Sequence, residues 1–128
     1  MRLGPMIGLS VAVALSAGSA ALAHHSGAMF DRTKTIALKG VIKSFNWTNP
    51  HTWTYILVPN AEGGTDEWGI EGGSPNILAR VNAKWNKNSI KVGDTVTITI
   101  NPVKDGRKMG VMQFVTYSDG EILKGAGL

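Results

Sequence analysis

Cysteine is absent from this sequence of 128 residues. Disulfide bonds, which stabilise many small exported domains, are therefore excluded, and so is chemistry at a thiol. The fold must depend on its hydrophobic core.

Concentrated positive charge is also absent. The chain has 13 Lys and Arg residues against 9 Asp and Glu, and its lysines are scattered rather than clustered. Proteins that bind nucleic acid usually gather basic residues in one patch or stripe. The charge pattern therefore predicts that nucleic acid is not a partner.

The sequence lacks a long uninterrupted hydrophobic run. Residues 6–22 are mostly apolar, but glycine and serine interrupt them repeatedly, which disfavours a membrane-spanning helix of about 20 residues. The stretch follows a charged residue, Arg2, and ends in Ala21-Leu22-Ala23, the small-x-small pattern of a cleavage site. Residues 1–23 are therefore predicted to be a signal peptide. The mature protein is expected to be periplasmic or secreted, with no stable membrane span after cleavage.

The predicted mature chain begins at His24 and has 105 residues, enough for one hydrophobic core. Loss of Arg2 leaves 12 basic residues against 9 acidic ones, a net charge of +3. We expect an N-terminal arm at 24–35, a folded domain at 36–123 and a flexible, glycine-rich tail at 124–128.

The domain shows five stretches with the pattern of β-strands, at 36–45, 53–58, 66–71, 95–100 and 111–117. The fourth alternates most cleanly, because threonines separate Val96, Ile98 and Ile100. In the first, the apolar residues change face at Gly40, which predicts a glycine bulge in a long, bent strand.

A short helix is predicted to begin at Pro75. Ser74 can cap it, and proline suits the first helical position because its missing N–H needs no partner there. One apolar stripe follows, made of Ile77, Leu78, Val81 and Trp85. The order β-β-β-α-β-β predicts a mainly β, five-stranded OB-like barrel with one short helix between strands three and four.

The stretch from Trp47 to Trp53 is a polar corner between the first two strands. If strands two and three form a hairpin, Thr54 lies near Glu71 and His51 near Ser74, within one register step. Two corners, at 49–51 and 71–76, then meet at one end of the barrel. Convergent polar groups beside aromatic walls are typical of a binding site. The candidate ligand-binding residues are Trp47, Asn49, His51, Trp53, Glu71, Ser74 and Asn76.

Histidines suggest a metal site. After cleavage, His24 would carry a free α-amino group beside its own imidazole, and His25 or His51 could add a second imidazole. Nitrogen ligands of this kind suit Cu(II). The predicted metal ligands are therefore His24, His25 and His51, with copper as the possible cofactor. Met109 and Met112 could add soft ligands for Cu(I), although methionines in a barrel strand usually belong to the core.

Each of these features also has a plainer interpretation. In this interpretation the arm histidines simply follow the cleavage site, a lone His51 is structural, as such histidines often are, and the four tryptophans belong to the core. The leading hypothesis is an exported metal-binding module. The alternatives are a metal-free binder of a small ligand or anion at the helix start, and a subunit that docks a partner protein. No Gly-x-Ser-x-Gly nucleophile motif accompanies Ser74 and His51, so we expect no enzymatic activity.

Several motifs together carry a family resemblance: His24-His25-Ser26, Met29-Phe30-Asp31, Trp47-Thr48-Asn49-Pro50-His51, Glu71-Gly72-Gly73-Ser74-Pro75-Asn76 and Lys91-Val92-Gly93-Asp94. The chain resembles a family of small exported bacterial proteins catalogued as a domain of unknown function. The resemblance implies an exported single domain with no established activity. The chain departs from the family pattern at Gly27, often phenylalanine, and in the stretch from Val81 to Trp85, where the family has Arg-Gly-Trp.

Overall fold

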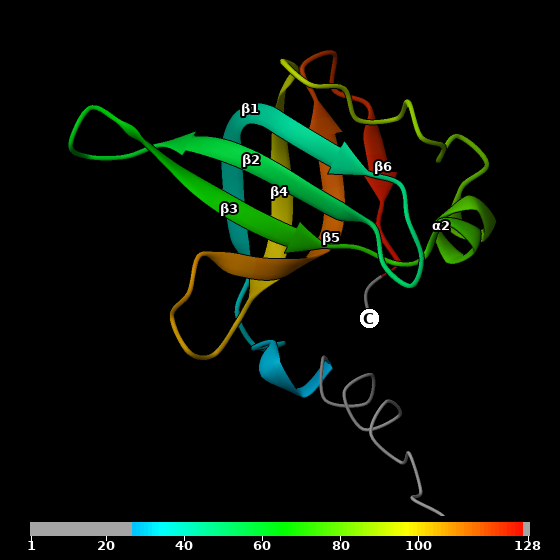
Figure 1. Ribbon diagram of the computed structural model, residues 1–128, viewed down its shortest axis with the longest axis horizontal. Coiled ribbons are helices and arrows are strands. Elements are labelled where there is room, and N and C mark those ends of the chain that lie inside the picture. Colours follow the sequence, from blue (N-terminus) through cyan, green and yellow to red (C-terminus); the bar gives the residue numbers. More distant parts are fainter. Residues whose placement is uncertain (1–26, 127–128) are drawn as a thin grey trace, which may run out of the picture.

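The computed structural model describes residues 27–126 (Figure 1). The strands of this part are β1 (Ile36–Asn46), β2 (Trp53–Pro59), β3 (Thr65–Glu71), β4 (Thr95–Pro102), β5 (Met109–Tyr117) and β6 (Ile122–Lys124). Its helices are a 3-10 turn, η1 (Gly27–Met29), and the short α2 (Pro75–Val81). The predicted signal peptide, together with His24 and His25, lies outside the described residues.

The strands form a sheet in the order β3-β2-β1-β4-β5-β6 that closes on itself. Closure occurs where β3 and β5 pair in parallel, with Gly69 opposite Met109 and Glu71 opposite Val111. All other neighbours pair antiparallel. The prediction of a five-stranded, OB-like barrel with one short helix between strands three and four is confirmed.

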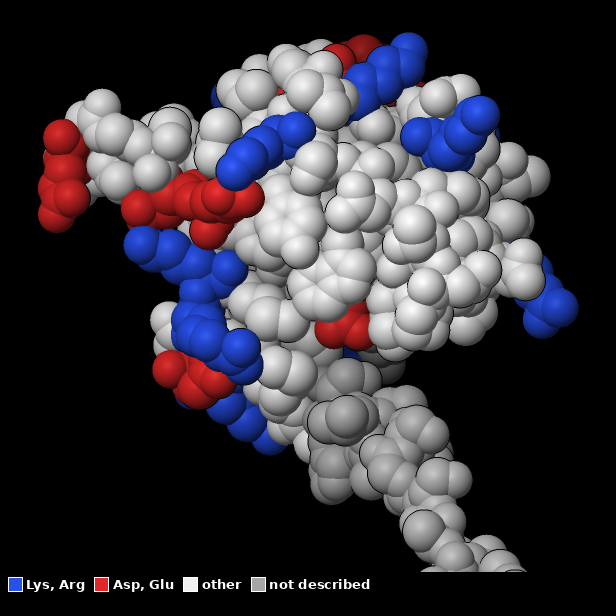
Figure 2. All heavy atoms as spheres, viewed as in Figure 1, with Lys and Arg blue, Asp and Glu red and all other residues white. Residues whose placement is uncertain are grey.

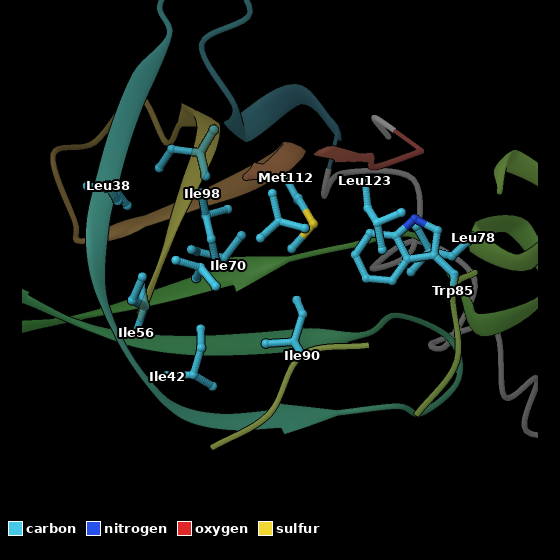
Figure 3. Close-up of a cluster of buried hydrophobic side chains, with 13 residues drawn as sticks. Leu38, Ile42, Ile56, Ile70, Leu78, Trp85, Ile90, Ile98, Met112 and Leu123 are labelled. Carbon is cyan, nitrogen blue, oxygen red and sulfur yellow. The ribbon is translucent and has the colours of Figure 1, made fainter. Parts of the chain in front are cut away.

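The barrel interior is filled by aliphatic side chains that point inward from every strand (Figure 3). Ile56, Ile70 and Ile98 are fully buried at its centre. Burying one such side chain stabilises the fold by about 1.5–3 kcal/mol relative to leaving it exposed. Ile98 alternates with Thr97 and Thr99, which is the pattern that the sequence analysis used to find this strand.

Gly40 has a different role from the predicted one. Leu38, Gly40 and Ile42 all face inward, so the alternation of β1 continues through the glycine. The irregularity in pairing with β2 lies further on, between Ile42 and Ser44. A Cβ atom at Gly40 would lie 2.2 Å from the Leu57 carbonyl oxygen, so glycine permits close approach of two strands where β1 bends. The predicted bend is present, but the bulge at Gly40 was wrong.

The predicted apolar stripe of the helix is divided. Leu78 is buried, and Trp85, which lies beyond the end of α2, is buried as well. In contrast, Ile77 is 46% exposed and Val81 is 44% exposed. The prediction that all four residues share a buried face was wrong, because α2 ends at Val81 and a turn then brings Trp85 back to the barrel.

Both ends of the described chain contact the barrel. Phe30 is 1% exposed and packs with Val103 and Val111 in a second, smaller hydrophobic cluster, so the described part of the predicted arm is attached. At the other end, β6 adds a strand that the sequence analysis missed, and Leu123 of β6 is buried. Gly125 donates a backbone hydrogen bond to Gln113. Within residues 27–126, no helix combines the length and the hydropathy needed to cross a membrane.

Candidate functional site

The two predicted corners do lie side by side. In the β2–β3 hairpin Trp53 is opposite Glu71, one register step from the predicted pairing. Beyond the hairpin, the Thr52 amide donates to the Gly73 carbonyl at 3.1 Å and the Gly72 amide donates to the Thr52 carbonyl at 2.8 Å. The prediction that residues 49–51 and 71–76 meet at one end of the barrel is confirmed.

Five residues of these strands and of the adjoining corner form a continuous row outside the main core. Thr54 and Ile56 are buried inside the barrel, so the alternating positions of β2 face outward. We call the residues His51, Trp53, Tyr55, Gly69 and Glu71 the outer row. Tyr55 is opposite Gly69 and Trp53 is opposite Glu71, so the row crosses from one strand to the other.

His51 is held by two acceptors at one end of the outer row. Its Nδ1 atom lies 3.3 Å from the Gly72 carbonyl oxygen and 3.4 Å from Glu71 Oε1. With a proton on Nδ1, the ring donates to the Gly72 carbonyl with the Glu71 carboxylate beside it, and Nε2 is left unprotonated on the other side of the ring. The His51 side chain is 28% exposed, which leaves it accessible to a ligand.

Glu71 is an unusual residue for the outside of a barrel strand, because it is only 3% exposed. It is opposite Trp53 on one side and Val111 on the other. Burial raises the pKa of Glu71 above its ordinary value, and the nearby His51 acts in the opposite direction. A carboxylate in this position is costly to keep ionised, and its position beside His51 is the clearest polar feature of the corner.

The other predicted ligand residues divide into structural and exposed ones. Ser74 Oγ accepts a hydrogen bond from the Ile77 amide at 3.3 Å, so this hydroxyl caps α2 as predicted. Trp47 packs against the main core beside Phe45, with 6.0 Å between ring centroids. Asn49 and Asn76 are exposed. The corner therefore brings together His51, Glu71 and Trp53 most directly.

The described residues do not complete a metal site by themselves. No group of three or more His, Cys, Asp or Glu side chains within residues 27–126 is placed to hold a metal ion. Met112 is buried in the main core, and Met109 packs against the second cluster, as methionines in a barrel usually do. His51 is the single predicted metal ligand that lies within the described residues.

Tyr55 and Gly69 are members of the outer row that the sequence analysis did not select. The rings of Trp53 and Tyr55 are stacked, with centroids 6.3 Å apart and planes inclined by 19°. The spacing of Trp53 and Tyr55 could have identified this pair, since aromatic residues two apart in a strand share one face. Figure 2 shows that many charged side chains of the viewed surface gather near the outer end of the β2–β3 hairpin and around the β4–β5 loop, while the surface over β2 and β3 is mostly uncharged.

Comparison with protein families assigns the chain to one of them. Residues 12–113 match a family described as "Family of unknown function (DUF6152)". The chain belongs to this family. No curated protein matches it. The expected resemblance to a domain of unknown function is therefore confirmed.

Among solved structures, the chain is similar to the mitochondrial single-stranded DNA-binding protein Rim1 from S. cerevisiae. The identity is 16%, the TM-score is 0.45, and the match covers 72% of this chain and 96% of that chain. The prediction that nucleic acid is not a partner is corrected here, because scattered lysines did not prevent similarity to a DNA-binding protein. The likeness concerns the fold, and the ligand of this chain must be argued from its own residues.

Proposed function

We propose that the mature chain is an exported, non-enzymatic module that binds Cu(II), with His51 as the ligand on the barrel and His24 and His25 as further ligands. The observation that supports this proposal is the position of His51 Nδ1, within 3.4 Å of both the Gly72 carbonyl oxygen and Glu71 Oε1. Histidines that bind metals usually donate their second ring N–H to a carboxylate or a backbone carbonyl, which fixes the ring and its tautomer. His51 has both kinds of acceptor, and Nε2 is left to bind the metal.

The attachment of the arm supports a contribution from His24 and His25. Phe30 packs on Val111, Val111 is opposite Glu71 across the β3–β5 pairing, and Glu71 contacts His51. The anchor point of the arm is therefore close to the corner. Gly27–Met29 is a 3-10 turn with a rise of about 2 Å per residue, so His25 can lie up to about 13 Å from Phe30. In our proposal, His25 lies at a shared site within this distance. Its imidazole, with that of His24 and the terminal amine, gives the nitrogen-rich set that Cu(II) prefers.

The role of the terminal amine can be tested by moving the amine while all three histidines stay in place. Cu(II) is titrated into protein that starts at His24 and into protein that retains Ala23. The extension moves the free amine away from His24, so we expect sharply weaker binding. Affinity should also fall as the pH drops below the pKa values of the amine and the imidazoles, because protons compete for the same nitrogens. Equal affinity for the two proteins would reject the terminal-amine site.

His51→Ala tests the barrel ligand in the same assay, and Asn88→Ala, which changes an exposed residue outside both corners, is the control. We expect His51→Ala to weaken binding and Asn88→Ala to leave it unchanged. If His51→Ala binds Cu(II) as tightly as the control does, the barrel does not contribute to the site.

A further inference from the structure

A second feature of the outer row is a groove of about 440 Å³ beside the proposed metal corner. Its lining includes Trp53 and Tyr55 of β2, Gly69 of β3, and Arg107 and Lys108 of the β4–β5 loop. Gly69 lies between the two groups, because it is opposite Tyr55 on one side and donates to the Lys108 carbonyl on the other. The volume is in the range of small-molecule sites in proteins. The groove does not include His51, so it can be considered separately from the metal proposal.

Gly69 is the residue that the fold itself does not explain. Its backbone is outside the left-handed region where glycine is favoured, since the positive-φ glycines of the described chain are at other positions. A Cβ atom at position 69 would make ordinary contact, with Tyr55 Cε1 nearest at 3.4 Å. Glycine in the interior of a strand weakens the strand and often marks a place where a ligand approaches closely. What glycine does preserve here is the open space of the groove.

The aromatic rings next to Gly69 form an extended apolar surface. Trp53 and Tyr55 are nearly parallel and both are partly exposed. They lie outside the barrel, so the main core does not require them there. Rings of this kind bind flat ligands with apolar faces, and their polar atoms can bond to the edge of the ligand.

The charges around the groove cancel. Arg107 Nε is 2.8 Å from Asp105 Oδ2, Lys108 Nζ is 3.1 Å from Asp66 Oδ1, and Lys43 Nζ is 3.0 Å from Glu67 Oε2. Binding of a polyanion is driven by cations that release counterions, but each cation here has a carboxylate partner. A paired rim offers hydrogen-bond donors and acceptors side by side, which suits a ligand rich in hydroxyl groups.

We infer that this groove binds a neutral oligosaccharide, with the apolar face of a sugar ring on Trp53 and Tyr55 and its hydroxyl groups on the charged rim. The test uses maltohexaose, cellohexaose and chitohexaose as separate probes, in buffer containing a chelator so that copper cannot contribute. Binding is followed by NMR through the indole N–H of Trp53. We expect a saturable shift with at least one saccharide, and the same affinity at low and high salt because no counterions are released.

Substitutions then locate the site. Gly69→Val fills the groove with a residue that suits a strand, and we expect at least about tenfold weaker binding, with a similar loss in Tyr55→Ala, which removes the second ring but keeps the Trp53 indole as the reporter. Lys104→Gln is the control, because Lys104 is an exposed residue of the β4–β5 loop that does not line the groove, and this variant should bind normally. A thermal melt verifies that each variant is folded, and the indole signals of the other tryptophans provide a second test of the fold.

Three results would overturn the inference. The first is the absence of any Trp53 shift with all three saccharides. The second is binding of an oligothymidylate in place of the saccharides, weakening with salt, which would assign the groove to single-stranded nucleic acid. The third is undiminished saccharide binding by folded Gly69→Val, which would place the site elsewhere.

Discussion

Strand β4 and the outer row are parts of one barrel, but they follow different rules. In β4 the inward positions Val96, Ile98 and Ile100 are buried and aliphatic, and the barrel accounts for each of them. In the outer row, Glu71 is a buried carboxylate and Gly69 is a glycine that the backbone does not require. Residues that the fold does not need, or that reduce its stability, are the ones that indicate a binding surface.

The contrast concerns energy as well as composition. Each aliphatic side chain of β4 stabilises the barrel by leaving water. Glu71 does the reverse when it is ionised, because the carboxylate loses its hydration and His51 compensates only in part. The comparison therefore predicts that substitutions in β4 destroy the fold, whereas substitutions in the outer row change binding first.

The largest effect is expected inside β4. Ile98→Asp places a carboxylate where the exposed fraction is zero, which costs several kcal/mol and should unfold the domain. Thr97→Asp is the matched control on the other face of the same strand and should be mild. Thermal unfolding followed by circular dichroism compares the two. Equal loss of stability would reject the assignment of faces on which the comparison depends.

Glu71→Gln should separate stability from binding. Since Glu71 has a raised pKa in the folded state, ionisation at neutral pH opposes folding, and the neutral amide should raise the free energy of unfolding there. The gain should shrink as the pH falls through the raised pKa and vanish below the ordinary value of 4.5, where wild-type Glu71 is also neutral. Affinity of this variant for Cu(II) should fall about 10–100-fold, because the amide oxygen can still accept from His51 but no longer supplies the negative charge that makes the imidazole a stronger ligand.

Chemical denaturation at neutral and acidic pH, together with Cu(II) titration, measures both consequences of Glu71→Gln. Reduced stability at neutral pH would show that the carboxylate is needed by the fold. Unchanged affinity would show that Glu71 does not support a metal ligand. Either result would remove Glu71 from the proposed site.

The smallest effect is expected at Ser74. Its hydroxyl caps α2 through the Ile77 amide, so Ser74→Ala should lower the free energy of unfolding by about 1 kcal/mol. Cu(II) affinity should be unchanged, because the hydroxyl is used by the helix. A selective loss of affinity without loss of stability would mean that Ser74 belongs to the ligand site after all.

Much of the barrel could be predicted from local patterns. Alternation in β4 and the cap at Ser74 are local signals, and the register of the β2–β3 hairpin follows from the short turn between these strands. Phe30 and β6 could not be predicted in this way. Phe30 is buried by residues more than seventy positions away, and β6 has three residues, too few to show a period.

The candidate site could be predicted only in the part that depends on the β2–β3 hairpin. Pairing alone placed His51 near Ser74 and in the same corner as Glu71, but burial of Glu71 depends on closure of β3 against β5, which is a contact between distant segments. The groove escaped prediction for the same reason, since Arg107 and Lys108 reach Gly69 only through that closure. Gly40 shows the converse error, because a glycine required by close packing was interpreted as a bulge.

The central claim is that His51 binds Cu(II) through Nε2 while Gly72 and Glu71 hold Nδ1. Pulsed electron paramagnetic resonance tests it most directly, because the distant nitrogen of each coordinated imidazole gives its own modulation. Copper-loaded protein that begins at His24 should lose the contribution of one imidazole when His51 is replaced by alanine, and should keep all of them in Asn88→Ala. Identical modulation in the wild-type protein and in His51→Ala would contradict the account.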